Sequence, residues 1–291
     1  MKKICVLSGK GGVGKSSITA SLAVTLSKDY NIICADCDVD ASNLSLVLNS
    51  KLNMSEGIAT NEIATVDESK CVGCKKCVRN CYFHAITFDE KPNINETKCE
   101  GCGVCKGLCP TKAISMQDIE NANLEVSQTE FGFVVVSAQI KMGNGGSGKV
   151  VTEVKNKAGE YKSDIMLIDC AAGVGCPVIS AVHDCNYALI VTEPARTAFS
   201  DMKRAISLLE HFQIPFGVII NKADINDSQR KYFEKHLNDN GNKIIDRFDY
   251  NKSFRDALIQ MTPVINYDET FRDAFENISK HIAKEAKFEE I

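Results

Sequence analysis

The stretch SGKGGVGKSS, at residues 8–17, follows a short apolar run and precedes a segment with helical periodicity. From Gly9 to Ser16 it fits G-x-x-x-x-G-K-[ST], a pattern whose glycines let backbone N–H groups turn toward phosphate oxygens. Its lysine neutralises phosphate charge and the hydroxyl after it binds Mg²⁺, roles that fall on Lys15 and Ser16. We therefore expect a nucleotide-phosphate site formed by the residues of this loop: Gly9, Gly11, Gly12, Val13, Gly14, Lys15, Ser16 and Ser17.

Strands and helices are predicted to alternate around this loop. Apolar runs at 2–8 and 31–38 are typical of buried parallel strands, and the segment 17–28 between them has apolar residues at helical spacing. Strand-like runs return later, at 131–140, 164–170, 187–193, 215–221 and 242–248. Because segments with helical periodicity separate the last four, we predict an α/β fold with a mostly parallel sheet covered by helices on both faces.

The composition limits the location and the partners that we expect. The 291 residues carry a net charge of −4, which gives no reason to expect nucleic acid or an anionic membrane surface as a partner. No stretch approaches the roughly 20 apolar residues of a membrane span, and the first apolar run is too short for a signal peptide. We therefore expect a cytoplasmic protein, whose 14 cysteines stay reduced instead of forming structural disulfides.

Eight of these cysteines form two runs with the same spacing, C-x2-C-x2-C-x3-C. This repetition resembles the bacterial ferredoxins that hold two [4Fe–4S] clusters, in which the fourth cysteine of each run binds the other cluster. The resemblance implies two ligand sets: Cys71, Cys74, Cys77 and Cys109 for one cluster, and Cys99, Cys102, Cys105 and Cys81 for the other. Zinc is the competing interpretation, although zinc sites use separated C-x2-C pairs. One departure from the ferredoxin pattern is Tyr82, which stands where proline usually follows the fourth cysteine.

The cysteine-rich segment is predicted to be a domain inserted into the α/β fold. Apolar runs are short there, and strand character resumes after it. We predict three segments: 1–64 as the first part of the P-loop domain, 65–115 as an inserted ferredoxin-like domain, and 116–291 as the second part of the P-loop domain.

The lysine at position 10 gives the phosphate loop a second feature. With it the loop resembles the deviant P-loop ATPases of the MinD superfamily, whose signature is K-G-G-x-G-K-[ST]; the resemblance covers 1–50 and 130–265. It implies a homodimer that forms on ATP binding, in which Lys10 reaches the partner's phosphates. It also implies that Asp38 is the switch I aspartate, which orients water, and that Asp169 is the switch II aspartate near Mg²⁺.

The segment NKAD, at 221–224, raises the question of which base is bound. N-K-x-D is a guanine-reading pattern in GTPases, where the aspartate pairs with the base, which would make Asp224 a base-binding residue. The family resemblance instead implies ATP, with Asn221 near the adenine. We favour ATP, because the whole pattern outweighs four residues in one loop.

Three other cysteines invite separate expectations. Cys5 and Cys34 lie in apolar strands and are expected to be core residues. Cys176 follows Asp169 by seven residues, where the nitrogenase iron protein, which the chain also resembles, has a ligand of its intersubunit cluster. We expect Cys176 to be a buried cysteine at the start of a helix, with the ligand role as the alternative.

The combined resemblance implies an ATPase that couples a dimer cycle to low-potential electron transfer through two [4Fe–4S] clusters. Its cofactors would be the clusters, ATP or ADP, and Mg²⁺, and its partner an unidentified redox protein. The alternative is an ATP-dependent carrier of the Mrp type, which assembles Fe–S clusters and delivers them to an acceptor protein. A positioning ATPase that uses the clusters as sensors is a third hypothesis.

Overall fold

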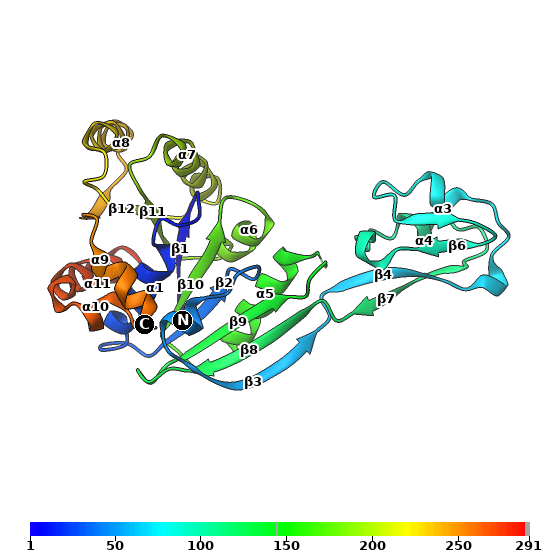
Figure 1. Cartoon of the computed structure of the whole chain (residues 1–291), viewed down its shortest axis with the longest axis horizontal. Coiled ribbons are helices and arrows are strands. Elements are labelled where there is room, and N and C mark those ends of the chain that lie inside the picture. Colours follow the sequence, from blue (N-terminus) through cyan, green and yellow to red (C-terminus); the bar gives the residue numbers. More distant parts are fainter. Residues whose placement is uncertain (144, 289–291) are drawn as a thin grey trace.

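A computed structural model describes residues 1–143 and 145–288. Within these residues one nine-stranded sheet has the order β13-β12-β11-β1-β10-β2-β9-β8-β3 (Figure 1). Its first seven strands run parallel: β13 (Ile244–Phe248), β12 (Phe216–Asn221), β11 (Tyr187–Thr192), β1 (Lys2–Ser8), β10 (Ile165–Ala172), β2 (Ile32–Cys37) and β9 (Val134–Ile140). The predicted α/β fold with a mostly parallel sheet is therefore confirmed.

Helices cover both faces of this sheet because the central strands are apolar on both sides. One face carries α1 (Lys15–Leu26), α2 (Leu44–Val47), α9 (Lys252–Ile259), α10 (Val264–Tyr267) and α11 (Arg272–Glu285). The other carries α5 (Ser147–Gly159), α6 (Cys176–Val182), α7 (Arg196–His211) and α8 (Asp227–Asp239). Fully buried Phe275 and Phe233 belong to the two respective cores.

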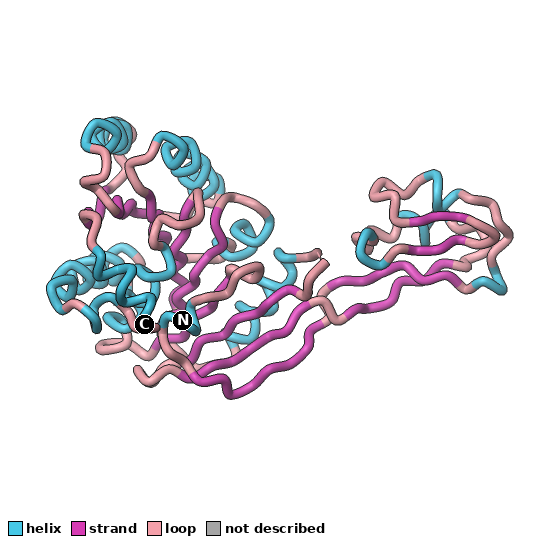
Figure 2. The backbone as a smooth tube through the Cα atoms, viewed as in Figure 1, coloured by secondary structure: helices cyan, strands magenta, loops and turns pink. Residues whose placement is uncertain are grey.

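Two antiparallel strands at the sheet edge were not predicted. They are β3 (Lys51–Ile58) and β8 (Ala122–Gln128), and β3 pairs with β8 along its length. Most β3 side chains are exposed, so this strand lacks the apolar alternation that marks a half-buried strand. Figure 2 shows both strands leading away from the body of the molecule toward a smaller unit.

A two-stranded ribbon joins the smaller unit to these strands. It pairs β4 (Asn61–Val66) with β7 (Ile114–Ile119), and Thr65 lies opposite Ser115 in its register. Beyond the ribbon lie α3 (Lys76–Arg79), β5 (Ile86–Phe88), β6 (Pro92–Ile94) and α4 (Val104–Leu108). This unit, here called the insert (residues 61–119), projects from one edge of the sheet (Figure 1).

The two cysteine runs fold into the same local structure. Asp67 and Asn95 each cap a 3₁₀ turn with a side-chain oxygen, and those turns are Glu68–Lys70 and Glu96–Lys98. A residue with positive φ then precedes each short helix, Lys75 before α3 and Gly103 before α4. Equal spacing of cysteines has thus produced an internal structural repeat.

A buried amide side chain lies at the junction between the insert and the sheet. Asn121 is fully buried. Its Oδ1 accepts a hydrogen bond from Thr60 N at 2.8 Å, and its Nδ2 donates to Gly145 O at 3.1 Å. Asn121 therefore ties both strands of the junction to the segment that leads into α5.

No helix in the described part of the chain has the length and apolarity needed to cross a membrane.

Candidate functional site

The phosphate loop connects β1 to α1, as its sequence context predicted. Gly14 has φ +91°, a left-handed conformation that side chains disfavour, and a Cβ there would also overlap Asn221 Nδ2. A Cβ at Gly9 would overlap the backbone of Asp201 in α7. The loop can therefore take this shape only with glycine at these two positions.

Asp169 is the buried centre of the site. It is 1% exposed, and its carboxylate accepts hydrogen bonds from Lys15 Nζ at 2.8 Å, Ser16 Oγ at 2.7 Å and Thr19 Oγ1 at 2.8 Å. Burial, the largest effect, would lower the pKa of Lys15, but the charge and hydrogen bond of Asp169 together with the charge of Asp36 raise it overall. The structure thus brings together the predicted magnesium residues, Ser16 and Asp169; Thr19 was not predicted to join them.

Two further aspartates lie at the end of β2, Asp36 within the strand and Asp38 just after it, and their surroundings differ. Asp36 Oδ2 is buried and accepts from Ser42 Oγ at 2.7 Å and from Leu44 N at 2.9 Å, so it holds the start of α2. Asp38 instead borders the cavity above the phosphate loop. Burial raises the pKa of Asp38, against the opposing effect of Lys15.

A cavity of about 550 Å³ opens over the loop. Its polar lining comes from the loop itself together with Asp38 and Asn43, and the rest of its lining includes the apolar side chains Leu46, Val47, Leu258 and Met261. Sequence reasoning missed these apolar residues because α2 and α9 approach the loop only in the folded chain. The cavity therefore combines the polar lining of the phosphate loop, which suits phosphates, with apolar side chains from α2 and α9, which suit a planar base.

The NKAD segment donates hydrogen bonds to the backbone of the phosphate loop. Asn221 Nδ2 donates to Val13 O at 2.8 Å, and Lys222 Nζ donates to Gly12 O at 3.0 Å. Asp224 Oδ1 accepts from Tyr250 N at 2.6 Å. These contacts give Asn221 and Asp224 partners within the protein, and the expectation that they bind the base stays a prediction.

Lys10 has an ion-pair partner within its own chain that the sequence did not predict. Its Nζ lies 2.9 Å from Glu193 Oε1, and Lys222 Nζ lies 2.8 Å from Glu193 Oε2. Glu193 directly follows β11, at the end of the run 187–193 that was predicted as a strand. The charge of Glu193 could have marked it as a candidate site residue, but the sequence does not reveal that it pairs with Lys10.

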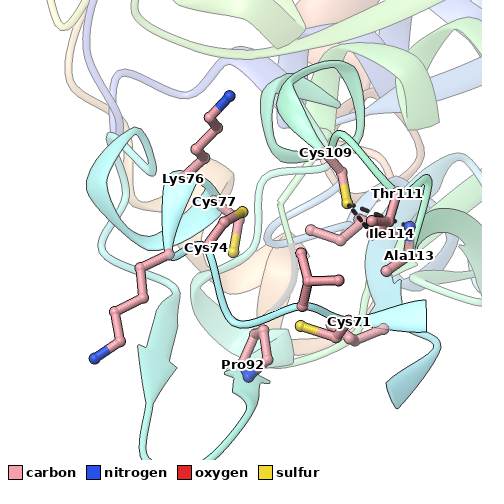
Figure 3. Close-up of a pocket in the computed structure, with 12 residues that line it drawn as sticks. Cys71, Cys74, Lys76, Cys77, Pro92, Cys109, Thr111, Ala113 and Ile114 are labelled. Atoms are coloured by element: carbon pink, nitrogen blue, oxygen red, sulfur yellow. Dashed lines mark hydrogen bonds between the residues drawn. The ribbon is translucent and has the colours of Figure 1, made fainter. Parts of the chain in front are cut away.

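In the described part of the insert, two cavities are lined by cysteines of both runs. The first is bordered by Cys71, Cys74, Cys77 and Cys109 (Figure 3). The second is bordered by Cys81, Cys99, Cys102 and Cys105. Each run therefore sends its fourth cysteine to the cavity of the other run. Across residues 1–143 and 145–288, no group of three or more His, Cys, Asp or Glu side chains is arranged to hold a single metal ion.

Backbone amides approach several of these sulfurs. Ala113 N donates to Cys109 Sγ at 3.2 Å, and Ala85 N donates to Cys81 Sγ at 3.3 Å. Burial would raise the pKa of Cys109, but hydrogen bonds, first that from Ala113 N, outweigh it and lower the pKa. The amide four residues after each fourth cysteine thus donates to the sulfur of that cysteine.

The remaining cysteines are divided between core and surface. Cys5 and Cys34 are fully buried, which confirms the prediction for both. Cys176 begins α6 as expected, but it is exposed, so the expectation that it is buried was wrong. Pro177 follows Cys176 in the first turn of α6.

The fold and the loop together define a P-loop nucleotide-binding protein of the α/β class. Residues 4–264 match the family described as the CobQ/CobB/MinD/ParA nucleotide binding domain, and the chain belongs to that family. This confirms the resemblance of the phosphate loop to the MinD superfamily.

Three similar proteins illustrate the range of this family. "Uncharacterized protein MJ0578" of Methanocaldococcus jannaschii is 40% identical over 225 residues, which cover 77% of this chain and 79% of that protein. The "iron-sulfur cluster carrier protein" of Pyrococcus abyssi is 23% identical over 224 residues, or 75% and 60% of the two chains. The septum site-determining protein MinD with Mg-ADP from Pyrococcus horikoshii shares the fold, with a TM-score of 0.58, 19% identity and coverage of 97% and 96%.

Proposed function

We propose that this protein binds and hydrolyses ATP and couples a nucleotide-dependent dimer cycle to low-potential electron transfer through two [4Fe–4S] clusters in its insert. The observation that carries the proposal is the pair of four-cysteine cavities on a chain that also has a complete phosphate loop. The proposed domains are those expected from the sequence, with the ferredoxin-like part at 65–115.

The donor sets fit cubane clusters. A [4Fe–4S] cluster needs four thiolates around a space, one for each iron. Four cysteines border each cavity, and backbone amides donate to the sulfurs of Cys109 and Cys81. A zinc ion would need four donors converging on one point at about 2.3 Å. The arrangement therefore favours clusters over zinc.

The chain would hold the clusters in apolar surroundings. When bound, the clusters supply one-electron oxidation and reduction at low potential. Val66 and Ile114 border the first cavity, and Ala64, Ile86 and Met116 border the second, so apolar side chains line part of each cavity. Water exclusion and N–H donors are two means by which a protein sets a cluster potential.

The nucleotide site would use the residues grouped around Asp169. Lys15 would bind the β- and γ-phosphates, while Ser16 and Asp169 would hold Mg²⁺ directly and through water. Asp38, which borders the same cavity, would orient the attacking water. Lys10 would reach the phosphates of a second copy of the chain, where an added cation stabilises transferred charge.

An ATP-dependent Fe–S cluster carrier is the second candidate function. The relative from Pyrococcus abyssi, an "iron-sulfur cluster carrier protein", favours it. Cys102 is exposed, which would ease release of a cluster from the second cavity. A carrier loses a cluster to an apo-acceptor, whereas an electron carrier keeps both through many turnovers.

Metal analysis tests the proposal directly. Protein purified without oxygen should contain about eight irons and eight acid-labile sulfides per chain, as two cubane clusters require. A stoichiometric zinc content with little labile sulfide would contradict the cluster assignment. Incubation of the iron-loaded protein with an apo-ferredoxin then separates the two functions, because an electron carrier retains its iron and a cluster carrier transfers part of it.

A further inference from the structure

A buried carboxylate near the phosphate loop binds two lysines at once. Glu193 is 8% exposed, and its two oxygens contact different ammonium groups: Oε1 contacts Lys10 at 2.9 Å and Oε2 contacts Lys222 at 2.8 Å. Burial would raise the pKa of Glu193, but the hydrogen bonds from Lys222 and Lys10 outweigh it and lower the pKa. Glu193 is therefore held as an anion between two cations.

The two lysines are not equivalent. Lys222 also donates to Gly12 O at 3.0 Å, so its ammonium is fixed between the carboxylate and the backbone of the phosphate loop. Lys10 belongs to the loop itself, and its side chain is 32% exposed. Of the two, Lys10 is the lysine that can swing outward without breaking a contact to the loop backbone.

Lys222 determines what happens to Glu193 when Lys10 leaves. A buried carboxylate without a cation is strongly destabilising, which would normally prevent such a movement. Here the ion pair with Lys222 remains, so the carboxylate keeps a charged partner. The second lysine thus lowers the barrier to releasing the first.

We propose that Glu193 is a positioning residue that retains Lys10 within its own subunit until a γ-phosphate on a second subunit competes for it. The inference rests on the proposed role of Lys10 across a dimer. ADP lacks the γ-phosphate, so the ion pair to Glu193 persists with ADP. ATP adds the charge that outcompetes a carboxylate shared between two lysines. Glu193 would therefore make dimer formation depend on which nucleotide is bound.

The first test measures whether Glu193 retains Lys10, independently of any dimer. The nucleotide-free protein is labelled with an amine-reactive acetylating reagent, and the rate at Lys10 is read by mass spectrometry. Glu193→Gln should raise the labelling rate of Lys10 several-fold, because a neutral amide holds an ammonium less tightly. Glu276→Gln, which removes the exposed ion pair with Lys28, serves as the matched control and should leave the rate at Lys10 unchanged.

The second test measures the dimer by analytical ultracentrifugation with ADP or a non-hydrolysable ATP analogue. Glu193→Gln should form the ATP dimer at about tenfold lower protein concentration than wild type and should dimerise in part with ADP. Lys222→Gln should act in the opposite direction, because Glu193 then binds Lys10 alone. Nucleotide affinity, measured with a fluorescent analogue, separates these effects from damage to the loop, and circular dichroism verifies folding.

The outcomes distinguish this inference from the proposed function. Unchanged labelling of Lys10 in folded Glu193→Gln overturns the inference. So does an ATP-dependent wild-type dimer that neither Glu193→Gln nor Lys222→Gln alters. If Lys10 labelling rises but wild type and variants all stay monomeric with ATP, the retaining contact is supported and the dimer cycle of the proposed function is wrong.

Discussion

Three acidic side chains at neighbouring strand ends illustrate how one residue's role depends on its partners. Asp36 and Asp169 are direct register partners in β2 and β10, and both are buried. Lys15 neutralises Asp169, whereas Asp36 accepts only uncharged donors in the contacts given above. Burial and the charge of Asp169 raise the pKa of Asp36 to about 6. Asp38, two residues later, reaches the cavity instead.

The raised pKa of Asp36 predicts how stability depends on pH. Because the folded value, about 6, exceeds the ordinary 3.8, the folded protein binds the proton more tightly than the unfolded chain. The contribution of Asp36 to the free energy of unfolding is therefore complete below pH 3.8 and is lost as pH rises through about 6. The full change corresponds to about 3 kcal/mol.

Urea denaturation of the nucleotide-free protein at several pH values measures this effect. The difference in unfolding free energy between wild type and Asp36→Asn should fall as pH rises from about 4 to about 6 and stay constant above about 7. Loss of hydrogen bonds in the variant shifts the whole curve without changing this slope. Parallel curves across the range would show that Asp36 has an ordinary pKa.

At the scale of elements, the insert consists of one pattern used twice and interlocked. Each cysteine run forms a capped turn and a short helix, and each gives its fourth cysteine to the other cavity. Cys77, Ile86 and Ile114 share one small core, so neither half has a core of its own. The two halves are therefore expected to depend on each other for stability.

Paired substitutions test which cysteines share a cluster. Cys109→Ser should lose about half of the iron. Cys71→Ser/Cys109→Ser should lose no more than that, because both cysteines border the first cavity. Cys99→Ser/Cys109→Ser should lose nearly all iron, because Cys99 borders the second cavity and Cys109 the first, so each cluster loses a ligand. The reverse order of the two double variants would mean that each run binds its own cluster.

Local patterns in the sequence predicted much of this fold, and long-range contacts account for what was missed. The buried strands and amphipathic helices are encoded in their own residues, as are the two cysteine runs. By contrast, β3 is an exposed edge strand, and its pairing depends on β8, more than 60 positions away. Glu193 and Asn121 act through contacts with residues distant in sequence, Lys10 and Gly145 respectively.

At the scale of the whole molecule, the insert and the nucleotide site lie on one continuous structure. Glu100 in the insert approaches Gly145, whose carbonyl Asn121 binds. A Cβ on Gly148, in the first turn of α5, would lie 3.4 Å from Cys176 O, so α5 packs closely on α6. The chain leads back from α6 to Asp169. Contacts between neighbouring segments, together with the chain itself, therefore link the second cavity to Asp169, the residue expected near Mg²⁺.

Coupling between nucleotide and clusters is the central claim of this account. Closure of a dimer would change solvent exposure and charge around the insert, both of which influence cluster potential. Lys10→Ala provides the control, because it removes the cation proposed to act across the dimer while leaving Lys15 to bind the phosphates.

The most direct measurement is an anaerobic redox titration of the clusters, followed by electron paramagnetic resonance, with ADP and with a non-hydrolysable ATP analogue. In wild type the cluster potentials should differ between the two nucleotides by on the order of 60 mV, a tenfold change for a one-electron couple. In Lys10→Ala this difference should vanish. Identical potentials with both nucleotides in wild type, at protein concentrations where the ATP dimer has formed, would contradict ATP-coupled electron transfer.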